Sequence, residues 1–195
     1  MTTEPDHPAI DAAGRLPMAR WLASPNADER PFGIEPDLLV IHNISLPPGQ
    51  FGGPWIEQLF QNRLDLQAHP FFAQIADMRV SAHLLIRRHG ELLQFVALQQ
   101  RAWHAGRSRF EGRPECNDYS IGIELEGSDE LPYTDLQYLR LVEVTALIQS
   151  RYPEITAERI TGHEQIAPGR KTDPGPAFDW TRYRTALSAI SGTVS

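Results

Sequence analysis

The stretch Asp37-Leu38-Leu39-Val40-Ile41-His42 decides the fold, because it is an unbroken run of mostly branched apolar residues that ends in a histidine. Such runs are typical of strands in the middle of a sheet. Prolines and glycines follow at 47–53, so the chain turns away from the sheet soon after this run. We therefore predict a central strand that carries His42 at its exposed end.

A second strand is predicted at 119–127, where apolar and polar residues alternate. Successive side chains of a strand point to opposite faces of the sheet. Glu124 and Glu126 should therefore share one face, while the apolar residues around them cover the other.

A hairpin and a short strand complete the predicted strands. The segments 80–87 and 91–98 are both strand-like and are joined through Gly90, whose permissive backbone suits a tight turn. A short strand at 159–162 would deliver His163.

Helices are predicted in three places. Pro54 can lie in the first turn of a short helix over 54–63, and Asp179 can cap a final helix. The longest helix is expected over 135–151, because a threonine and a glutamine at its start have the spacing of a capping box. Its apolar residues are spread too widely for one narrow stripe, so we expect other elements to cover it on more than one side.

Strands that alternate with helices, together with the hairpin, indicate an α/β fold: a single domain with a mixed central β-sheet flanked by helices. At 195 residues the chain is long enough for one such domain with a substantial core. Residues 37–190 should form it. Residues 1–36 are polar and punctuated by prolines, which predicts an irregular N-terminal arm packed on the domain.

The charge balance limits the partners and the location of the protein. Its 18 Lys and Arg against 25 Asp and Glu give a net charge of −7, and no basic run appears, which argues against nucleic acid as a partner. The N-terminus lacks the features of a secretory signal, and no long apolar stretch predicts a membrane segment. Cys116 is the single cysteine, as fits a reducing compartment. We therefore expect a cytoplasmic protein without membrane association.

His42, His163 and Asp173 form a candidate zinc set. Each histidine ends a predicted strand, and Asp173 follows in a loop fixed by proline and glycine. Three protein ligands leave a fourth position for water, which is the arrangement of catalytic zinc sites. The ligands come from two distant segments without a local signature, so their spacing alone is weak support for a metal.

Glu124 or Glu126 could handle protons beside this set, because zinc hydrolysis needs a base for the attacking water and an acid for the leaving amine. The two acids face the same way, and the residues alone leave the choice open. Lys171, the only lysine of the chain, lies just before Asp173. Its compact charge would neutralise the oxyanion that develops on the attacked carbonyl.

Five segments carry longer motifs. They are 39–49, 80–83, 101–106, 117–127 and 170–175. Together, in this order, they resemble the zinc N-acetylmuramoyl-L-alanine amidase family, and in particular its cytoplasmic 1,6-anhydro-N-acetylmuramyl-L-alanine amidases. The resemblance runs from about Trp21 to Tyr183, and the chain departs from the family pattern at 164–169 and at Glu115.

The resemblance implies the fold that these amidases share with peptidoglycan recognition proteins and phage amidases, here over 37–190. It implies one Zn²⁺ ion per chain, held by His42, His163 and Asp173. It also implies Glu124 as the catalytic acid and base and Lys171 as the stabiliser of the oxyanion. The reaction would be hydrolysis of the amide bond between the lactyl group of 1,6-anhydro-N-acetylmuramic acid and L-alanine in muropeptides, for peptidoglycan recycling.

Substrate contacts by Asn43, Arg79 and Trp103 are a further implication of the resemblance. A tryptophan ring can stack on a sugar, and an arginine can pair with a peptide carboxylate. The partner would be a small-molecule muropeptide, and we expect the protein to bind it as a monomer.

Two other functions fit parts of the sequence. Cys116 next to Asn117, with His104 or His163 nearby, could belong to a Cys/His cell-wall peptide hydrolase, which a thiol alkylator would inactivate and a chelator would not. The fold also includes non-catalytic muropeptide-binding proteins, which typically lack a complete ligand set. His83 and His104 are not expected to be ligands; we predict that His83 is structural and that His104 borders the groove.

Overall fold

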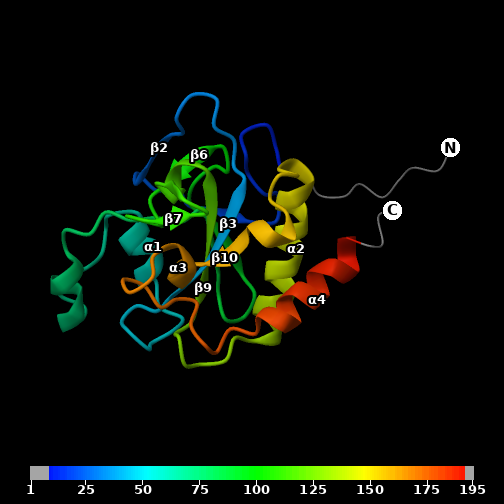
Figure 1. Cartoon of the computed structure of the whole chain (residues 1–195). Coiled ribbons are helices and arrows are strands. Elements are labelled where there is room, and N and C mark those ends of the chain that lie inside the picture. Colours follow the sequence, from blue (N-terminus) through cyan, green and yellow to red (C-terminus); the bar gives the residue numbers. More distant parts are fainter. Residues whose placement is uncertain (1–8, 192–195) are drawn as a thin grey trace.

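A six-stranded mixed sheet organises the chain in the computed structural model, which describes residues 9–191 (Figure 1). The strand order is β1-β5-β4-β9-β3-β10. The strands of this sheet are β1 (Arg20–Trp21), β3 (Leu38–Ile44), β4 (Leu84–Ile86), β5 (Leu92–Gln94), β9 (Ser120–Glu126) and β10 (Ile160–Gly162). The predicted α/β fold with a mixed central sheet is confirmed.

β3 and β9 are neighbouring interior strands of the sheet, and they run parallel in a register that sets His42 opposite Glu124. β10 pairs parallel with the other edge of β3. The predicted central strand is therefore confirmed. His42 is not exposed as expected, however, because its side chain is only 1% exposed and β3 continues for two residues beyond it.

Two helices, α2 (Asp135–Arg151) and α4 (Trp180–Ser191), cover one face of the sheet (Figure 1). They pack on Leu39, Ile41 and Ile123, which alternate with the site residues along β3 and β9. The shorter helices are α1 (Trp55–Phe60) and α3 (His163–Ile166). Three 3₁₀ helices lie at Pro70–Ile75, Cys116–Asp118 and Ala157–Arg159. No helix within residues 9–191 is long and apolar enough to span a membrane.

Helix α2 begins where the capping box was predicted. The Thr134 hydroxyl accepts a hydrogen bond from the Gln137 backbone, and the Gln137 side chain accepts one from the Thr134 backbone. The helix contacts both the sheet and α4, as expected, but two of its apolar residues, Leu136 and Leu139, are 51% and 67% exposed. Leucine is a good helix former, and single exposed leucines are common on protein surfaces, so its wide apolar spread does not require burial.

The predicted hairpin is present as the antiparallel pair β4 and β5. Gly90 lies in its turn with a φ of 85°, a backbone conformation that favours glycine. The strands are shorter than the predicted segments, because residues on both sides leave the ladder and form loops.

The N-terminal arm is less irregular than predicted. Residues 1–8 lie outside the described residues, but β1 adds a parallel edge strand next to β5. A further strand, β2 (Ala27–Glu29), pairs with β6 (Gln100–Ala102) in a separate two-stranded sheet.

The third sheet pairs β7 (Arg109–Phe110) with β8 (Arg113–Pro114). Strands of two or three residues are too short to show a periodic pattern, which is why the sequence does not predict them. The division of the chain at residues 36 and 37 stays a prediction.

Candidate metal centre

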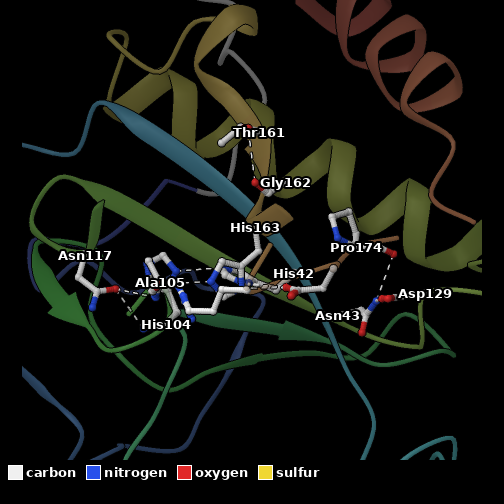
Figure 2. Close-up of polar contacts among 12 residues, drawn as sticks. His42, Asn43, His104, Ala105, Asn117, Asp129, Thr161, Gly162, His163 and Pro174 are labelled. Atoms are coloured by element: carbon white, nitrogen blue, oxygen red, sulfur yellow. Dashed lines mark hydrogen bonds and ion pairs between the residues drawn. The ribbon is translucent and has the colours of Figure 1, made fainter. Parts of the chain in front are cut away.

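The side chains of His42, His163 and Asp173 converge at one end of the central strands. The Nδ1 atoms of His42 and His163 are 2.9 Å apart, and Asp173 Oδ2 lies 3.1 Å from the first and 3.0 Å from the second. Both histidines are buried, and their rings meet edge to face with centroids 4.4 Å apart. Figure 2 shows the residues around them. The three side chains of the candidate zinc set are thus brought together by the fold, with their ligand atoms all within 4.8 Å of one another.

Strand topology explains this convergence. β10 and β3 are parallel neighbours, so their carboxyl ends meet at the same edge of the sheet and carry His163 to His42. The loop after α3 then returns, because the Glu164 backbone N–H donates to the carbonyl of Asp173. Asn43 holds the next residue of this loop, since its amide donates to the carbonyl of Pro174 and to Asp129 (Figure 2).

The chemistry of the three donor atoms fits a zinc ion. Nε2 of His163 lies 3.2 Å from the carbonyl oxygen of Ala105, which can only accept, so the proton of this ring is on Nε2 and Nδ1 offers its lone pair to the cluster. Burial lowers the pKa of His42 to about 4, which keeps its ring neutral. Tetrahedral zinc with ligands about 2.0–2.1 Å away separates them by roughly 3.3 Å, close to the spacing seen here. Two imidazole nitrogens and one carboxylate oxygen are a common catalytic zinc set.

Glu124 stands beside this cluster with an unusual environment for a carboxylate. Its side chain is buried, and no described residue gives its Oε2 atom a hydrogen bond. Burial raises its pKa well above the ordinary value, and the nearby carboxylate of Asp173 raises it further, while Lys171 opposes the change. Glu124 can therefore hold and release a proton at this site.

Glu126 shares the face of Glu124 but has a structural environment. Its Oε1 accepts hydrogen bonds from the Arg87 guanidinium at 2.7 Å and from the Gly52 backbone at 2.7 Å. Arg87 also pairs with Glu57. The carboxylate of Glu126 thus holds the loop before α1 to the sheet, and of the two acids only Glu124 faces the cluster.

A cavity of about 160 Å³ opens over the cluster. Glu124, Lys171, His104 and Ser81 line it together with His163 and Asp173. One wall is apolar and consists of Ile44, Leu59, Phe60, Met78 and Val80. Several polar and charged groups thus converge on one small cavity next to the cluster.

The other predicted site residues lie at different distances from this cavity. Lys171 and Asn43 line it. Arg79 is exposed and lines an adjacent hollow instead, where its guanidinium donates to the carbonyls of Ala76 and Met78. Trp103 is half-buried on the segment after β6 and does not line the cavity. The structure thus brings Lys171 and Asn43 to the cluster, but not Arg79 or Trp103.

His104 lines the cavity, as its expected place at the border of the groove implies, but its contact with His42 was not predicted. Its Nδ1 lies 2.9 Å from Nε2 of His42, on the side of that ring away from the cluster. Gly122 is the feature of the sequence that pointed to this contact, because a glycine inside a strand often marks the close approach of another group. His83 is a structural histidine as predicted: it is fully buried, and its Nδ1 accepts a hydrogen bond from the Gly122 backbone.

The N-acetylmuramoyl-L-alanine amidase family profile matches residues 32–176. The 1,6-anhydro-N-acetylmuramyl-L-alanine amidase AmpD of Escherichia coli (strain K12) is 61% identical over 175 residues, which are 90% of this chain and 95% of that protein.

Two solved structures are also similar. A crystal structure of a selenomethionine AmpD derivative has a TM-score of 0.88 at 59% identity and covers 90% of this chain and 97% of its own. The E. coli amidase AmiD, in complex with the substrate anhydro-N-acetylmuramic acid-L-Ala-D-γ-Glu-L-Lys, has a TM-score of 0.57 at 28% identity and covers 83% of this chain and 65% of its own. The chain therefore belongs to the N-acetylmuramoyl-L-alanine amidase family of hydrolases and groups within it with the 1,6-anhydro-N-acetylmuramyl-L-alanine amidases.

Proposed function

We propose that the protein is a zinc-dependent hydrolase that cleaves the amide bond between the lactyl group of 1,6-anhydro-N-acetylmuramic acid and L-alanine in muropeptides. The observation that carries the proposal is the convergence of His42, His163 and Asp173 beside the buried carboxyl of Glu124. The names of the similar proteins support the substrate, since one is a 1,6-anhydro-N-acetylmuramyl-L-alanine amidase and another is solved with an anhydromuramyl peptide.

One zinc ion per chain would be held by Nδ1 of His42, Nδ1 of His163 and Oδ2 of Asp173. Zinc in such a site acidifies water and polarises a carbonyl as a Lewis acid.

Glu124 is the proton carrier in this proposal. Its carboxylate takes a proton from the attacking water and passes it to the nitrogen of the departing L-alanine, which leaves as an amine. Its raised pKa suits the second step, because a carboxyl group that holds its proton near neutral pH can donate it to the leaving group.

Lys171 stabilises the oxyanion that forms on the lactyl carbonyl. The ammonium is on the cavity lining, within electrostatic reach of Glu124. A positive charge already in place where negative charge develops lowers the barrier without further reorganisation.

Substrate contacts by Asn43, Arg79 and Trp103 are part of the proposal. Asn43 lines the cavity, and its side-chain oxygen could accept a hydrogen bond from the substrate while its amide nitrogen holds the loop. Arg79 is exposed at the rim, and its guanidinium would exchange its backbone acceptors for a carboxylate of the stem peptide. We further propose that the enzyme works as a monomer in the cytoplasm, where its unpaired cysteine is compatible with a reducing environment.

The rival Cys/His hydrolase has less support. Cys116 is fully buried, and its Sγ atom shares a hydrogen bond with the hydroxyl of Tyr119. A buried thiol without a neighbouring base is a structural residue more often than a nucleophile.

Mass spectrometry of anhydromuramyl-tripeptide incubated with the native protein and with Asp173→Ala tests the function. We expect free tripeptide and anhydromuramic acid from the native protein only, and a lower zinc content in Asp173→Ala. Binding of the muropeptide without cleavage would identify a recognition protein instead. Cleavage within the peptide that a thiol alkylator abolishes would identify the cysteine chemistry.

A further inference from the structure

We propose that His104 is a positioning residue that holds His42 in the tautomer with its proton on Nε2, and that Ser120 fixes His104 in turn. His42 then presents the lone pair of Nδ1 to the zinc site. This inference rests on the proposed zinc site and concerns how the chain prepares one of its ligands.

Hydrogen bonds link His42 to His104 and His104 to Ser120. The direction of both follows from the hydroxyl of Ser120. The Ser120 hydroxyl has one proton, which it donates to the carbonyl of Cys116 at 2.6 Å. Its oxygen lies 3.2 Å from Nε2 of His104 and must accept there, so the proton of the His104 ring is on Nε2.

The next step follows in the same way. With its proton on Nε2, the neutral His104 ring has a lone pair on Nδ1. This atom lies 2.9 Å from Nε2 of His42 and can only accept from it. The proton of His42 is therefore on Nε2, and its Nδ1 faces His163 and Asp173 as a ligand atom. A ring fixed in this tautomer loses no free energy to rearrangement when a metal binds.

Ala105, the residue after His104, fixes the tautomer of the second ligand, His163. The carbonyl of Ala105 faces Nε2 of His163 at 3.2 Å. The side-chain oxygen of Asn117 accepts from the backbone N–H groups of both His104 and Ala105, at 3.1 and 2.8 Å (Figure 2). One dipeptide, fixed by one amide, thus supplies the outer hydrogen-bond partner of both ligand histidines.

Gly122 on β9 makes room for the His104 ring. A Cβ atom at this position would lie 2.5 Å from both Cγ and Nδ1 of His104. The backbone of Gly122 has no positive φ, so the ring and not the strand conformation explains the glycine. Gly122→Ala should therefore displace the His104 ring without removing any polar group.

The test compares His104→Asn with His104→Leu, two side chains of similar size. The Oδ1 atom of asparagine can accept from His42 Nε2 where His104 Nδ1 did, whereas leucine offers no acceptor. Zinc affinity is measured by competition with a chromogenic chelator on folded protein. We expect His104→Leu and Gly122→Ala to bind zinc about 10–100-fold more weakly than the native protein, and His104→Asn to recover most of the loss. Equal losses in His104→Asn and His104→Leu would show a packing role and overturn the proposal.

A second measurement detects the hydrogen bond itself. In zinc-loaded protein with ¹⁵N-labelled histidine, a coupling across the hydrogen bond should join His42 Nε2, which carries the proton, to His104 Nδ1. A proton found on His104 Nδ1 would contradict the series. A native protein that binds no zinc would refute the proposed metal site, whereas native zinc binding that His104→Leu leaves unchanged would refute only the role of His104.

Discussion

Glu124 and Glu126 lie on the same face of one strand, yet their surroundings give them different properties. Glu126 is satisfied by Arg87 and a backbone N–H, whereas one oxygen of Glu124 has no partner among residues 9–191. The alternation of the strand predicted their shared face. The choice between them could not be predicted, because it depends on Arg87, which comes from a different strand region.

Replacement of Glu124 by glutamine keeps the shape of the side chain and removes its proton transfer. We expect kcat for anhydromuramyl-tripeptide to fall by about 10²–10⁴-fold, which is the usual contribution of a general acid and base. Zinc content should stay at the native value, because Glu124 is not a ligand. Steady-state kinetics on metal-analysed protein checks both, and a native kcat would exclude Glu124 from the mechanism.

The same carboxyl should make the stability of the zinc-free protein depend on pH. The pKa of Glu124 in the folded state is raised above its ordinary 4.5, chiefly by burial, so between these two values the folded state binds more protons than the unfolded state. Stability should therefore fall as pH rises through this window. Glu124→Gln has no carboxyl group to ionise at this position. It should therefore be more stable than the native protein at pH values above this window. Denaturant unfolding at several pH values checks this, and parallel curves for the two proteins would contradict it.

Lys171 is the only lysine of the chain, and its role depends on a compact charge. Lys171→Ala should lower kcat by about 10²–10³-fold, as the loss of one oxyanion donor does. The kcat of Lys171→Arg should fall nearly as much, because a guanidinium is bulkier and directs its donors differently. Both variants are assayed at equal zinc content. A native kcat in Lys171→Arg would show that any positive charge at this position is sufficient.

At the scale of elements, the parallel pairing of β3, β9 and β10 builds the site. Register sets Glu124 opposite His42, and the end of β10 sets His163 beside it. The apolar run and the alternating strand predicted β3 and β9, since both are long enough to show a pattern. β1 and β2 could not be predicted, because strands of two or three residues depend on partners elsewhere in the chain.

The contact between His104 and His42 belongs to the features that local sequence does not predict. His104 reaches the site from the loop after β6, over Gly122 of β9. Periodicity describes which face of an element a residue lies on, but not which loop packs over that face. Gly122 was visible in the sequence and marked the contact without identifying the residue that makes it.

Helix α2 lies on the face of the sheet away from the zinc site, so its cap should affect stability alone. Thr134→Ala removes the capping hydroxyl, and we expect a loss of about 0.5–2 kcal/mol in the free energy of unfolding. The turnover of folded enzyme should not change. Thr134→Ser keeps the hydroxyl and is the matched control in thermal and chemical unfolding. An equal loss in both variants would show that packing of the methyl group, and not the cap, stabilises the helix start.

At the scale of the whole molecule, the two faces of the sheet have separate tasks. One face carries α2 and α4 on an apolar core, and the other carries the metal ligands, Glu124 and the cavity. This division lets the ligands, which are distant in sequence, be held by a well-packed scaffold. We propose that a zinc ion held by His42, His163 and Asp173 would supply the Lewis acid for attack of water on the lactyl carbonyl.

Hydrolysis of anhydromuramyl-tripeptide in H₂¹⁸O tests that claim most directly, with protein that is stripped of metal and then reconstituted with zinc. We predict no cleavage by the stripped protein. After one equivalent of zinc, one ¹⁸O atom should appear in the lactyl carboxylate of anhydromuramic acid, with none in the released tripeptide. Equal cleavage by the stripped protein, or ¹⁸O in the tripeptide, would contradict zinc-dependent hydrolysis at this bond.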